Sequence, residues 1–155
     1  MVKGRYIEGI DNMSEVLRIR EVVFGDEFGI ADASDPVIDD EMAVHAVAYN
    51  DADEIVAVGT LYFDGETFTI DKIAVLKEYR KQFYGDFVLK VLIDKAAQAH
   101  ANEIYGNTFA GTEGFLASVG YVNHGTMYEL GNNKVQPMIL TSEKFANGCG
   151  SCCKH

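Results

Sequence analysis

The stretch from residue 70 to residue 102 constrains the fold more than any other part of the chain. Residues 73–76 form a short apolar run that suits a buried strand, and residues 77–82 are polar and turn-like. From Phe83 onward, apolar residues recur at three- and four-residue steps, which predicts a helix with one apolar face. That face consists of Val88, Leu89, Leu92, Ile93, Ala96 and Ala99. The stretch therefore predicts a strand, a basic turn and a long helix whose first turn has free backbone N–H groups.

Four basic residues cluster around the predicted start of this helix, namely Lys72, Lys77, Arg80 and Lys81. They stand out because the chain has 13 basic and 24 acidic residues and a formal net charge of -11. A helix N-terminus carries partial positive charge and unpaired donors, so it binds anions readily. The segment predicts a site for a phosphate-bearing ligand; the alternative is a basic turn that faces solvent.

The length of 155 residues fits one domain, and the hydrophobic fraction of 48% predicts a packed core. The first residues lack an apolar run of signal-peptide length, and no run approaches a membrane span, so we expect a cytoplasmic protein without a membrane partner. The acidic balance argues against nucleic acid as a main partner, because phosphate contacts need a basic face.

The chain as a whole predicts alternating strands and helices. Strands are expected at residues 5–9, 42–49, 55–63, 68–75, 103–108, 121–130 and 135–141, and helices at residues 16–24, from 83 onward and at 112–119. Asp11 or Ser14 is the expected N-cap of the first helix, Thr112 that of the last, and Gly25 and Gly29 are expected to end the first helix. Residues 31–41 are expected to form a loop, and Asp64-Gly65 predicts a hairpin. The order predicts an α/β protein, with an α+β mixed sheet and helices on both faces.

Four segments, taken in order, resemble the GNAT superfamily of N-acetyltransferases, small stand-alone bacterial members in particular. They are residues 20–30 with 40–45, the Val58-Gly59-Thr60 segment, IAVLKEYR at 73–80 and FLASVGY at 115–121. The family's cofactor loop reads Q/R-x-x-G-x-G/A, and Arg80 and Gly85 match its first and last positions. The resemblance implies a GNAT acyl-CoA N-acyltransferase fold over residues 1–145, followed by a flexible Cys-rich tail at 146–155.

The resemblance also implies an acetyl-CoA-dependent N-acetyltransferase that acts on a primary amine. Residues expected at the cofactor are Ile73, Ala74, Val75, Arg80, Lys81, Gln82, Phe83, Tyr84, Gly85 and Asn107. Asp71 corresponds to an acidic position that acts through water as a base in some members. The alternative for Asp71 is a strand-edge carboxylate paired with Lys72 or with solvent.

The sequence departs from the family at several of these positions. Phe83 stands at the middle glycine of the loop, where glycine would permit unusual backbone angles and close approach of a ligand. Asp86, in the first turn, would repel an anion. Leu116 stands at the usual proton-donating tyrosine, and Asn107 is the nearest substitute for a polar residue after the fifth strand. These departures leave open a binding or regulatory protein with impaired catalysis.

Three tyrosines, Tyr84, Tyr121 and Tyr128, lie near these positions in the sequence. The first belongs to the cofactor loop, and the other two are expected to pack. His45, His100 and His124 show no pattern that assigns them a role.

The stretch from Glu21 to Asp71 contains no Lys or Arg and many acidic residues. In the family fold this stretch forms the acceptor side of the groove, so it predicts attraction of a cationic amine: a polyamine, an aminoglycoside, a lysine or an N-terminal amine. A surface kept soluble by its charge is the alternative.

All three cysteines, Cys149, Cys152 and Cys153, lie in the C-terminal tail together with His155. Their position argues against a disulfide-stapled secreted fold and for a reducing compartment. A thiol or metal protein that acts through this tail is a third hypothesis, although no metal site is assigned. A homodimer is compatible with the sequence, which does not determine the oligomeric state.

Overall fold

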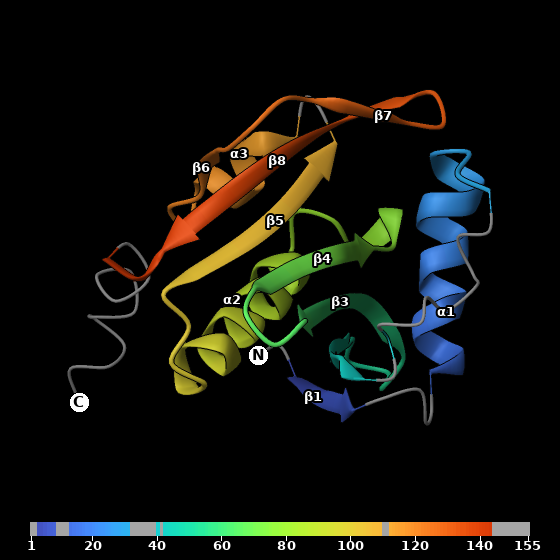
Figure 1. The fold of residues 1–155 in the computed structure, drawn as a ribbon. Helices are drawn as coiled ribbons and strands as arrows, with labels where there is room; N and C mark the ends of the chain where they lie inside the picture. The colour runs from blue at the N-terminus through green and yellow to red at the C-terminus, as the bar shows by residue number, and fades with distance from the viewer. Residues whose placement is uncertain (1–2, 9–12, 32–39, 41, 110–111, 144–155) are drawn as a thin grey trace.

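The computed structural model describes residues 3–8, 13–31, 40, 42–109 and 112–143. An eight-stranded mixed sheet has helices on both faces, as predicted (Figure 1). The strands are β1 (Lys3–Glu8), β2 (Val44–Tyr49), β3 (Ile55–Phe63), β4 (Phe68–Val75), β5 (Glu103–Phe109), β6 (Val122–Asn123), β7 (Tyr128–Leu130) and β8 (Asn133–Thr141). The helices are α1 (Ser14–Arg20), its π-helical continuation η1 (Glu21–Glu27), the 3-10 turn η3 (Lys77–Tyr79), α2 (Tyr84–Gln98) and α3 (Glu113–Ala117).

The strand order is β1-β2-β3-β4-β5-β8-β6, and β7 also pairs with β8. Every pairing is antiparallel except that of β4 with β5, which is parallel. This parallel ladder joins residues 68–70 to residues 104–106 and stops there. Beyond Ile70 and Gly106 the two strands separate, so a wedge opens between the two halves of the sheet.

The core has one part on each face of the sheet. On one face, α2 buries Val88, Leu89, Leu92, Ile93 and Ala96, which confirms the predicted apolar face, although Ala99 is exposed at the C-cap. On the other face, α1 and η1 contribute Val16, Ile19 and Val23. These side chains pack against one residue from each of β2, β3 and β4, namely Val47, Val58 and Ala74. Successive strand side chains point to opposite faces, which is why these strands are apolar on both.

Gly59 lets α2 lie directly on β3. A Cβ atom at this position would stand 2.6 Å from Cγ1 of Val88 and 3.1 Å from Cδ1 of Leu92. The small residue in the Val58-Gly59-Thr60 segment is therefore explained by helix packing, since any side chain here would push α2 away.

A β-bulge interrupts β4 beside the wedge. The register with β3 passes from Thr60↔Asp71 to Val58↔Ala74, so Lys72 and Ile73 together oppose Gly59. Lys72 has φ 56, in the left-handed region. Such bulges locally disrupt the ladder and increase the twist of the strand, which here happens at the point where β4 parts from β5.

The first helix differs from the prediction at both ends. Its N-cap is Met13, without a side-chain capping bond; Ser14 is already helical, and Asp11 lies outside the described residues. Gly25 does not end the helix, because η1 continues through it and buries Val23. Packing of Val23 compensates for the weak helix propensity of Gly25. The helical segment ends near Gly29, whose backbone has φ 71.

Near the C-terminal end of the described chain, the single predicted strand at 121–130 is divided into β6 and β7. Pro137 of β8 has no backbone N–H, and Gly125 has φ 96, so the ladder between the two short strands is interrupted. Thr112 is the N-cap of α3, but its hydroxyl donates to the carbonyl of Phe109 instead of capping the helix.

Most of the loop expected at 31–41, together with the tail at 146–155 and its three cysteines, lies outside the described residues. Within the part that the structure describes, no helix is long and apolar enough to cross a membrane.

Candidate functional site

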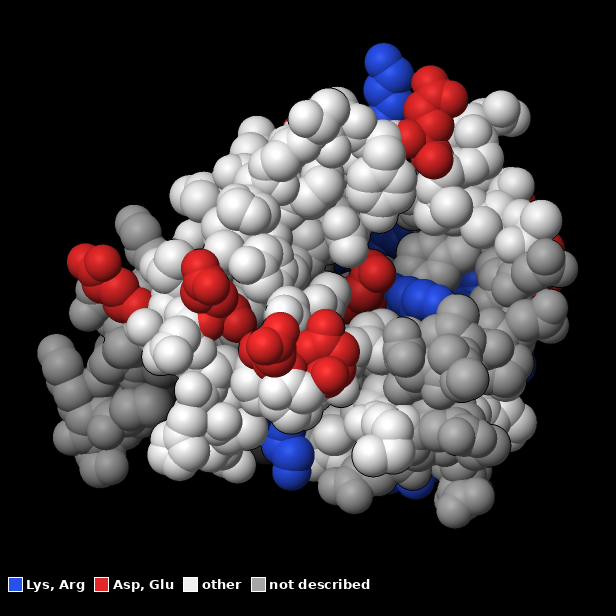
Figure 2. All heavy atoms as spheres, viewed as in Figure 1, with Lys and Arg blue, Asp and Glu red and all other residues white. Residues whose placement is uncertain are grey.

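A cavity of about 1000 Å³ opens in the wedge between β4 and β5. Figure 2 shows the hollow, with basic and acidic side chains next to each other inside it. Nine of the residues assigned from the sequence line it: Asp71, Ile73, Ala74, Val75, Arg80, Lys81, Phe83, Gly85 and Asn107. The fold therefore brings together most of the predicted site from four separate segments of structure.

Gln82 and Tyr84, which were also assigned to the cofactor, do not line the cavity. Gln82 is exposed, and its Nε2 donates to the carbonyl of Glu78 at 3.1 Å. The Tyr84 ring packs on the core and meets Tyr79 edge-on, with 5.9 Å between ring centroids. Only their backbone groups remain to face a ligand, because both side chains turn away.

The edge of β4 at residues 73–75 forms one wall of the cavity. β4 pairs with β3 along its other edge, whereas its ladder to β5 has ended at Ile70. An extended ligand could pair with this exposed strand edge as an additional strand would. The geometry is available because the β4–β5 ladder ends at Ile70 and Gly106.

Phe83 adopts the left-handed conformation that its position in the loop requires, with φ 71 and ψ 6. Lys81 is also left-handed, at φ 64. Phenylalanine adopts this backbone only at a cost, on the order of 1–3 kcal/mol for such a residue, so the loop keeps the conformation and carries strain. The side chain is 75% exposed, so little packing offsets the strain.

The start of α2 is suited to an anion. No side chain caps the helix at Phe83, so its first N–H groups remain donors for a ligand. Asp86 does not stand as an isolated negative charge, since Lys90 lies 3.1 Å from its carboxylate. A side chain at Gly85 would be tightly packed, because a Cβ atom would lie 3.1 Å from Cγ2 of Val75.

Arg80 is engaged by a residue that the sequence did not identify. Its Nη1 and Nη2 donate to the two carboxylate oxygens of Glu27 at 2.6 and 2.5 Å, and its Nε donates to the carbonyl of Val75 at 3.0 Å. These bonds lower the pKa of Glu27 and raise that of Arg80. No local pattern links residues 27 and 80, so only the fold reveals that η1 holds the cofactor loop.

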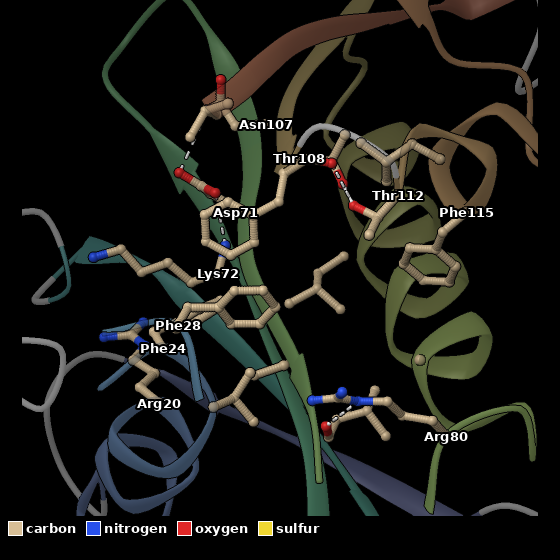
Figure 3. A pocket seen from close by; sticks show the side chains of 18 of the residues that line it. Arg20, Phe24, Phe28, Asp71, Lys72, Arg80, Asn107, Thr108, Thr112 and Phe115 are labelled. Carbon is tan, nitrogen blue, oxygen red and sulfur yellow. Dashed lines mark hydrogen bonds between the residues drawn. The ribbon is translucent and has the colours of Figure 1, made fainter. Parts of the chain in front are cut away.

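At the other end of the cavity, Asp71 is held by neutral donors. Its Oδ1 accepts the backbone N–H of Lys72 at 2.8 Å, and Nδ2 of Asn107 donates to its Oδ2 over 3.5 Å (Figure 3). Burial raises the pKa of this carboxyl above its usual range. The alternative of an Asp71–Lys72 ion pair is not realised, because only the Lys72 backbone contacts the carboxylate.

A buried polar network lies behind this end of the cavity. Arg20 donates to both carboxylate oxygens of Asp40, at 3.1 and 3.2 Å, and to Oγ1 of Thr60 at 2.8 Å. Tyr62 donates to Asp40 at 2.8 Å, and Nδ1 of His45 lies 2.8 Å from Oγ1 of Thr60. His45 therefore belongs to a structural network that joins α1, Asp40, β2 and β3.

Three aromatic residues form an apolar wall near Asp71. The π-helical geometry of η1 directs Phe24 and Phe28 toward the same side, where both meet Phe109 of β5 with ring centroids 6.1 and 4.4 Å apart. All three residues line the cavity.

Tyrosine positions differ partly from expectation. Leu116 is buried and lines the cavity, so the family's proton donor is absent from that place. Tyr121 packs as expected, and its buried hydroxyl has no hydrogen-bond partner among the described residues. Tyr128 lines the cavity, contrary to the prediction that it packs, and burial followed by the charge of Asp71 raises its pKa.

The expected acidic acceptor wall is not found among the described residues. Of the described acidic residues between 21 and 71, Asp71 alone lines the cavity; Glu27 pairs with Arg80, and Asp40 is buried against Arg20. The charged residues that line the cavity are Arg20, Lys72, Arg80, Lys81 and Lys90 on the basic side and Asp71 and Asp86 on the acidic side. The described residues therefore give no charge argument for a cationic acceptor; Asp32, Asp35, Asp39 and Glu41 of the same stretch lie outside them.

The family model described as "Acetyltransferase (GNAT) family" matches residues 13–121. Among solved structures, Escherichia coli ElaA is 18% identical with a TM-score of 0.78, over 90% of this chain and 99% of that chain. An acyl-CoA N-acyltransferase from Pseudomonas aeruginosa is 15% identical with a TM-score of 0.77, over 90% and 99% of the two chains. A chain of the NatC complex bound to Gag peptide and CoA is 13% identical with a TM-score of 0.68, over 90% and 98%. No curated protein matches the sequence, and at these identities the structural likeness shows the fold alone.

Proposed function

The chain belongs to the GNAT family of acetyltransferases, and on this premise we propose that it transfers an acetyl group from acetyl-CoA to a primary amine. The observation that carries the proposal is the cavity along the free edge of β4, which ends at the unpaired N-terminus of α2. An extended pantetheine arm that ends in a pyrophosphate needs both features at once. Acetyl-CoA supplies the acetyl thioester when it is bound.

We assign the cofactor side to the β4 edge and the loop that follows it. Ile73, Ala74 and Val75 offer backbone groups to the arm, and the backbone from Arg80 to Gly85, with the Lys81 ammonium, faces the pyrophosphate. Asn107 stands across the wedge from β4. In this proposal the loop binds the cofactor through the main chain of Gln82, Phe83 and Tyr84. The side chains of Gln82 and Tyr84 point away from the cavity, and that of Phe83 is held by the strained loop.

Asp71 is the proposed base. The acceptor must lose a proton before its nitrogen attacks the thioester carbonyl; the C–N bond then forms, the C–S bond breaks and the thiolate takes up a proton. A carboxyl with a raised pKa accepts a proton more readily near neutral pH than an ordinary aspartate does. Leu116 cannot protonate the thiolate, but a thiolate is a fair leaving group, so we expect a slower reaction rather than none.

The acceptor that we propose is a primary amine; a cationic small molecule, a lysine or an N-terminal amine all remain candidates. We also propose a cytoplasmic location without a nucleic-acid partner, as the composition suggests. A GNAT-fold protein that binds acetyl-CoA without transferring it is the second candidate, favoured by Leu116, which lines the cavity and cannot donate a proton.

The test begins with melting temperature and calorimetry in the presence of acetyl-CoA, with free coenzyme A for comparison. A ligand at 100 times its Kd adds about 2.7 kcal/mol to the free energy of unfolding. Release of free thiol is then followed with a panel of amines. The absence of a shift at millimolar acetyl-CoA contradicts the proposal, and binding without turnover favours the second candidate.

The variant Asp71→Asn tests the proposed base. We expect kcat to fall about 100 to 10,000-fold, with the affinity for acetyl-CoA unchanged. In the wild type, the rate should rise with pH as Asp71 loses its proton, at a pH above that of an ordinary aspartate, and this limb should vanish in the variant. Glu66→Gln, in the exposed β3–β4 turn, is the control. An unchanged kcat in Asp71→Asn contradicts the assignment.

A further inference from the structure

We infer that the acceptor carries a carboxylate as well as its amine, as a free apolar amino acid does, and that Lys72 binds this carboxylate. The inference deepens the proposed function and rests on it, since it assigns a substrate class to the same cavity. The carrying observation is a half-buried ammonium in the cavity wall that forms no hydrogen bond or ion pair with any described residue.

An unpaired ammonium in such a place is unfavourable without a ligand. Removing a cation from water costs free energy unless an anion or acceptor compensates. Near Lys72 the wall is largely apolar, with Phe24, Phe28 and Phe109 among its residues. Burial is the main cause that lowers the pKa of Lys72, and the charge of Arg20 adds to it, while the charges of Asp40 and Asp71 oppose the shift only in part. A carboxylate on the acceptor would supply the missing partner.

The other basic residues that line the cavity cannot take this role. Nη1 and Nη2 of Arg20 donate to Asp40 and Thr60; its Nε has no partner among the described residues, but the residue is 1% exposed and its charge is already paired with Asp40. Arg80 is paired with Glu27, and Lys90 with Asp86, near the start of α2. Lys81 belongs to the same loop end. Lys72 is therefore the cation available beside Asp71.

Asp71 and Lys72 together present two opposite charges that influence each other's pKa but form no ion pair. The Asp71 carboxylate points toward Asn107, whereas the Lys72 side chain runs away from it (Figure 3). A molecule with both an ammonium and a carboxylate matches this arrangement, because Asp71 receives the ammonium proton and Lys72 binds the carboxylate. The Phe24–Phe28–Phe109 wall suits an apolar side chain. A polyamine would instead bring a second cation toward Lys72, which is repulsive.

The experiment compares acceptors that differ in the carboxylate. L-Phenylalanine is paired with L-phenylalanine amide, L-leucine with 3-methylbutan-1-amine, and spermidine serves as the polycation. We expect kcat/KM for each acid to exceed that of its neutral counterpart by about tenfold or more, as the loss of a charge-assisted hydrogen bond gives. Lys72→Met should abolish this preference, measured as the ratio of kcat/KM for acid and neutral counterpart within the same variant, and Lys72→Arg should restore part of it. Lys134→Met, on exposed β8 surface, is the control.

Each other outcome overturns a distinct statement. Equal use of acid and amide, or a preference for spermidine, contradicts the carboxylate inference and leaves the acetyltransferase proposal intact. If acetyl-CoA binds and neutral amines are acetylated but no amino acid is, the carboxylate inference is likewise contradicted. If acetyl-CoA fails to shift the melting temperature, the proposed function itself fails. Melting temperatures of the Lys72 variants show that each has folded, so a lost preference cannot be ascribed to unfolding.

Discussion

Phe83 has a backbone conformation that glycine adopts freely and phenylalanine adopts at a cost, with φ 71. We expect Phe83→Gly to raise the free energy of unfolding by about 0.5–1 kcal/mol, because relief of strain exceeds the added entropy of the unfolded glycine. In a domain of this size, Tm rises by roughly 2–4 °C for each 1 kcal/mol gained in the free energy of unfolding. Calorimetry checks it, with Phe83→Ala as the control that removes the ring but keeps the strain. Phe83→Gly melting below Phe83→Ala would falsify the strain argument.

The ionised carboxylate of Asp71 is expected to lower the free energy of unfolding. Burial raises the pKa of its carboxyl above that of the unfolded chain, so its stabilising contribution is complete below the unfolded pKa, near 3.9, and is lost as pH rises through the folded pKa. At neutral pH the ionised group is therefore destabilising, and Asp71→Asn should melt higher than the wild type. The difference should shrink as pH falls toward 4. Melting curves between pH 4 and 8 test this, and a gap that widens at low pH contradicts it.

Among the elements, η1 and the loop before α2 are connected by one ion pair. The Glu27 and Arg80 side chains are 32% and 34% exposed, and such pairs contribute about 0–1 kcal/mol. Glu27→Gln should free Arg80 for the pyrophosphate and tighten coenzyme A binding by up to about fivefold. Calorimetry at low and high salt measures this, and Glu15→Gln, which breaks the exposed pair with Arg18, is the control. Weaker binding in Glu27→Gln would show that Glu27 orients Arg80 for the ligand instead.

Element boundaries were predictable wherever local chemistry decides them. The strands at 55–63 and 68–75 were predicted with the observed limits, since Asp64-Gly65 sets the turn between them. The predicted start of α2 at Phe83 is one residue from the observed start. Gly25 and the strand at 121–130 were predicted wrongly, because packing of Val23 overrides the first and Pro137, a residue of the partner strand, divides the second.

At the scale of the whole molecule, the Arg20–Asp40 pair links α1 to the end of the segment before β2. Both side chains are almost fully buried, at 1% and 0% exposure. We expect Asp40→Ala to lower the free energy of unfolding by about 3–5 kcal/mol, because the guanidinium is left buried without its anion. Urea denaturation measures this. The double variant Arg20→Met with Asp40→Leu is the matched control and should recover most of the loss; if it does not, the pair's charge is not the cause.

The sequence by itself determined the order of the elements, the apolar face of α2 and the hairpin, because periodicity and turn chemistry act over a few residues. The resemblance of four segments to the GNAT superfamily indicated the family to which the chain belongs. That resemblance also named nine of the residues that line the cavity, eight between Asp71 and Gly85 and the ninth at Asn107. The tertiary structure decided what the sequence left open. The engagement of Arg80 by Glu27, the Arg20 network and the unpaired ammonium of Lys72 depend on residues 20 to 53 positions apart. Such contacts leave no local pattern, since they arise only when the sheet twists, β4 bulges and β5 turns away.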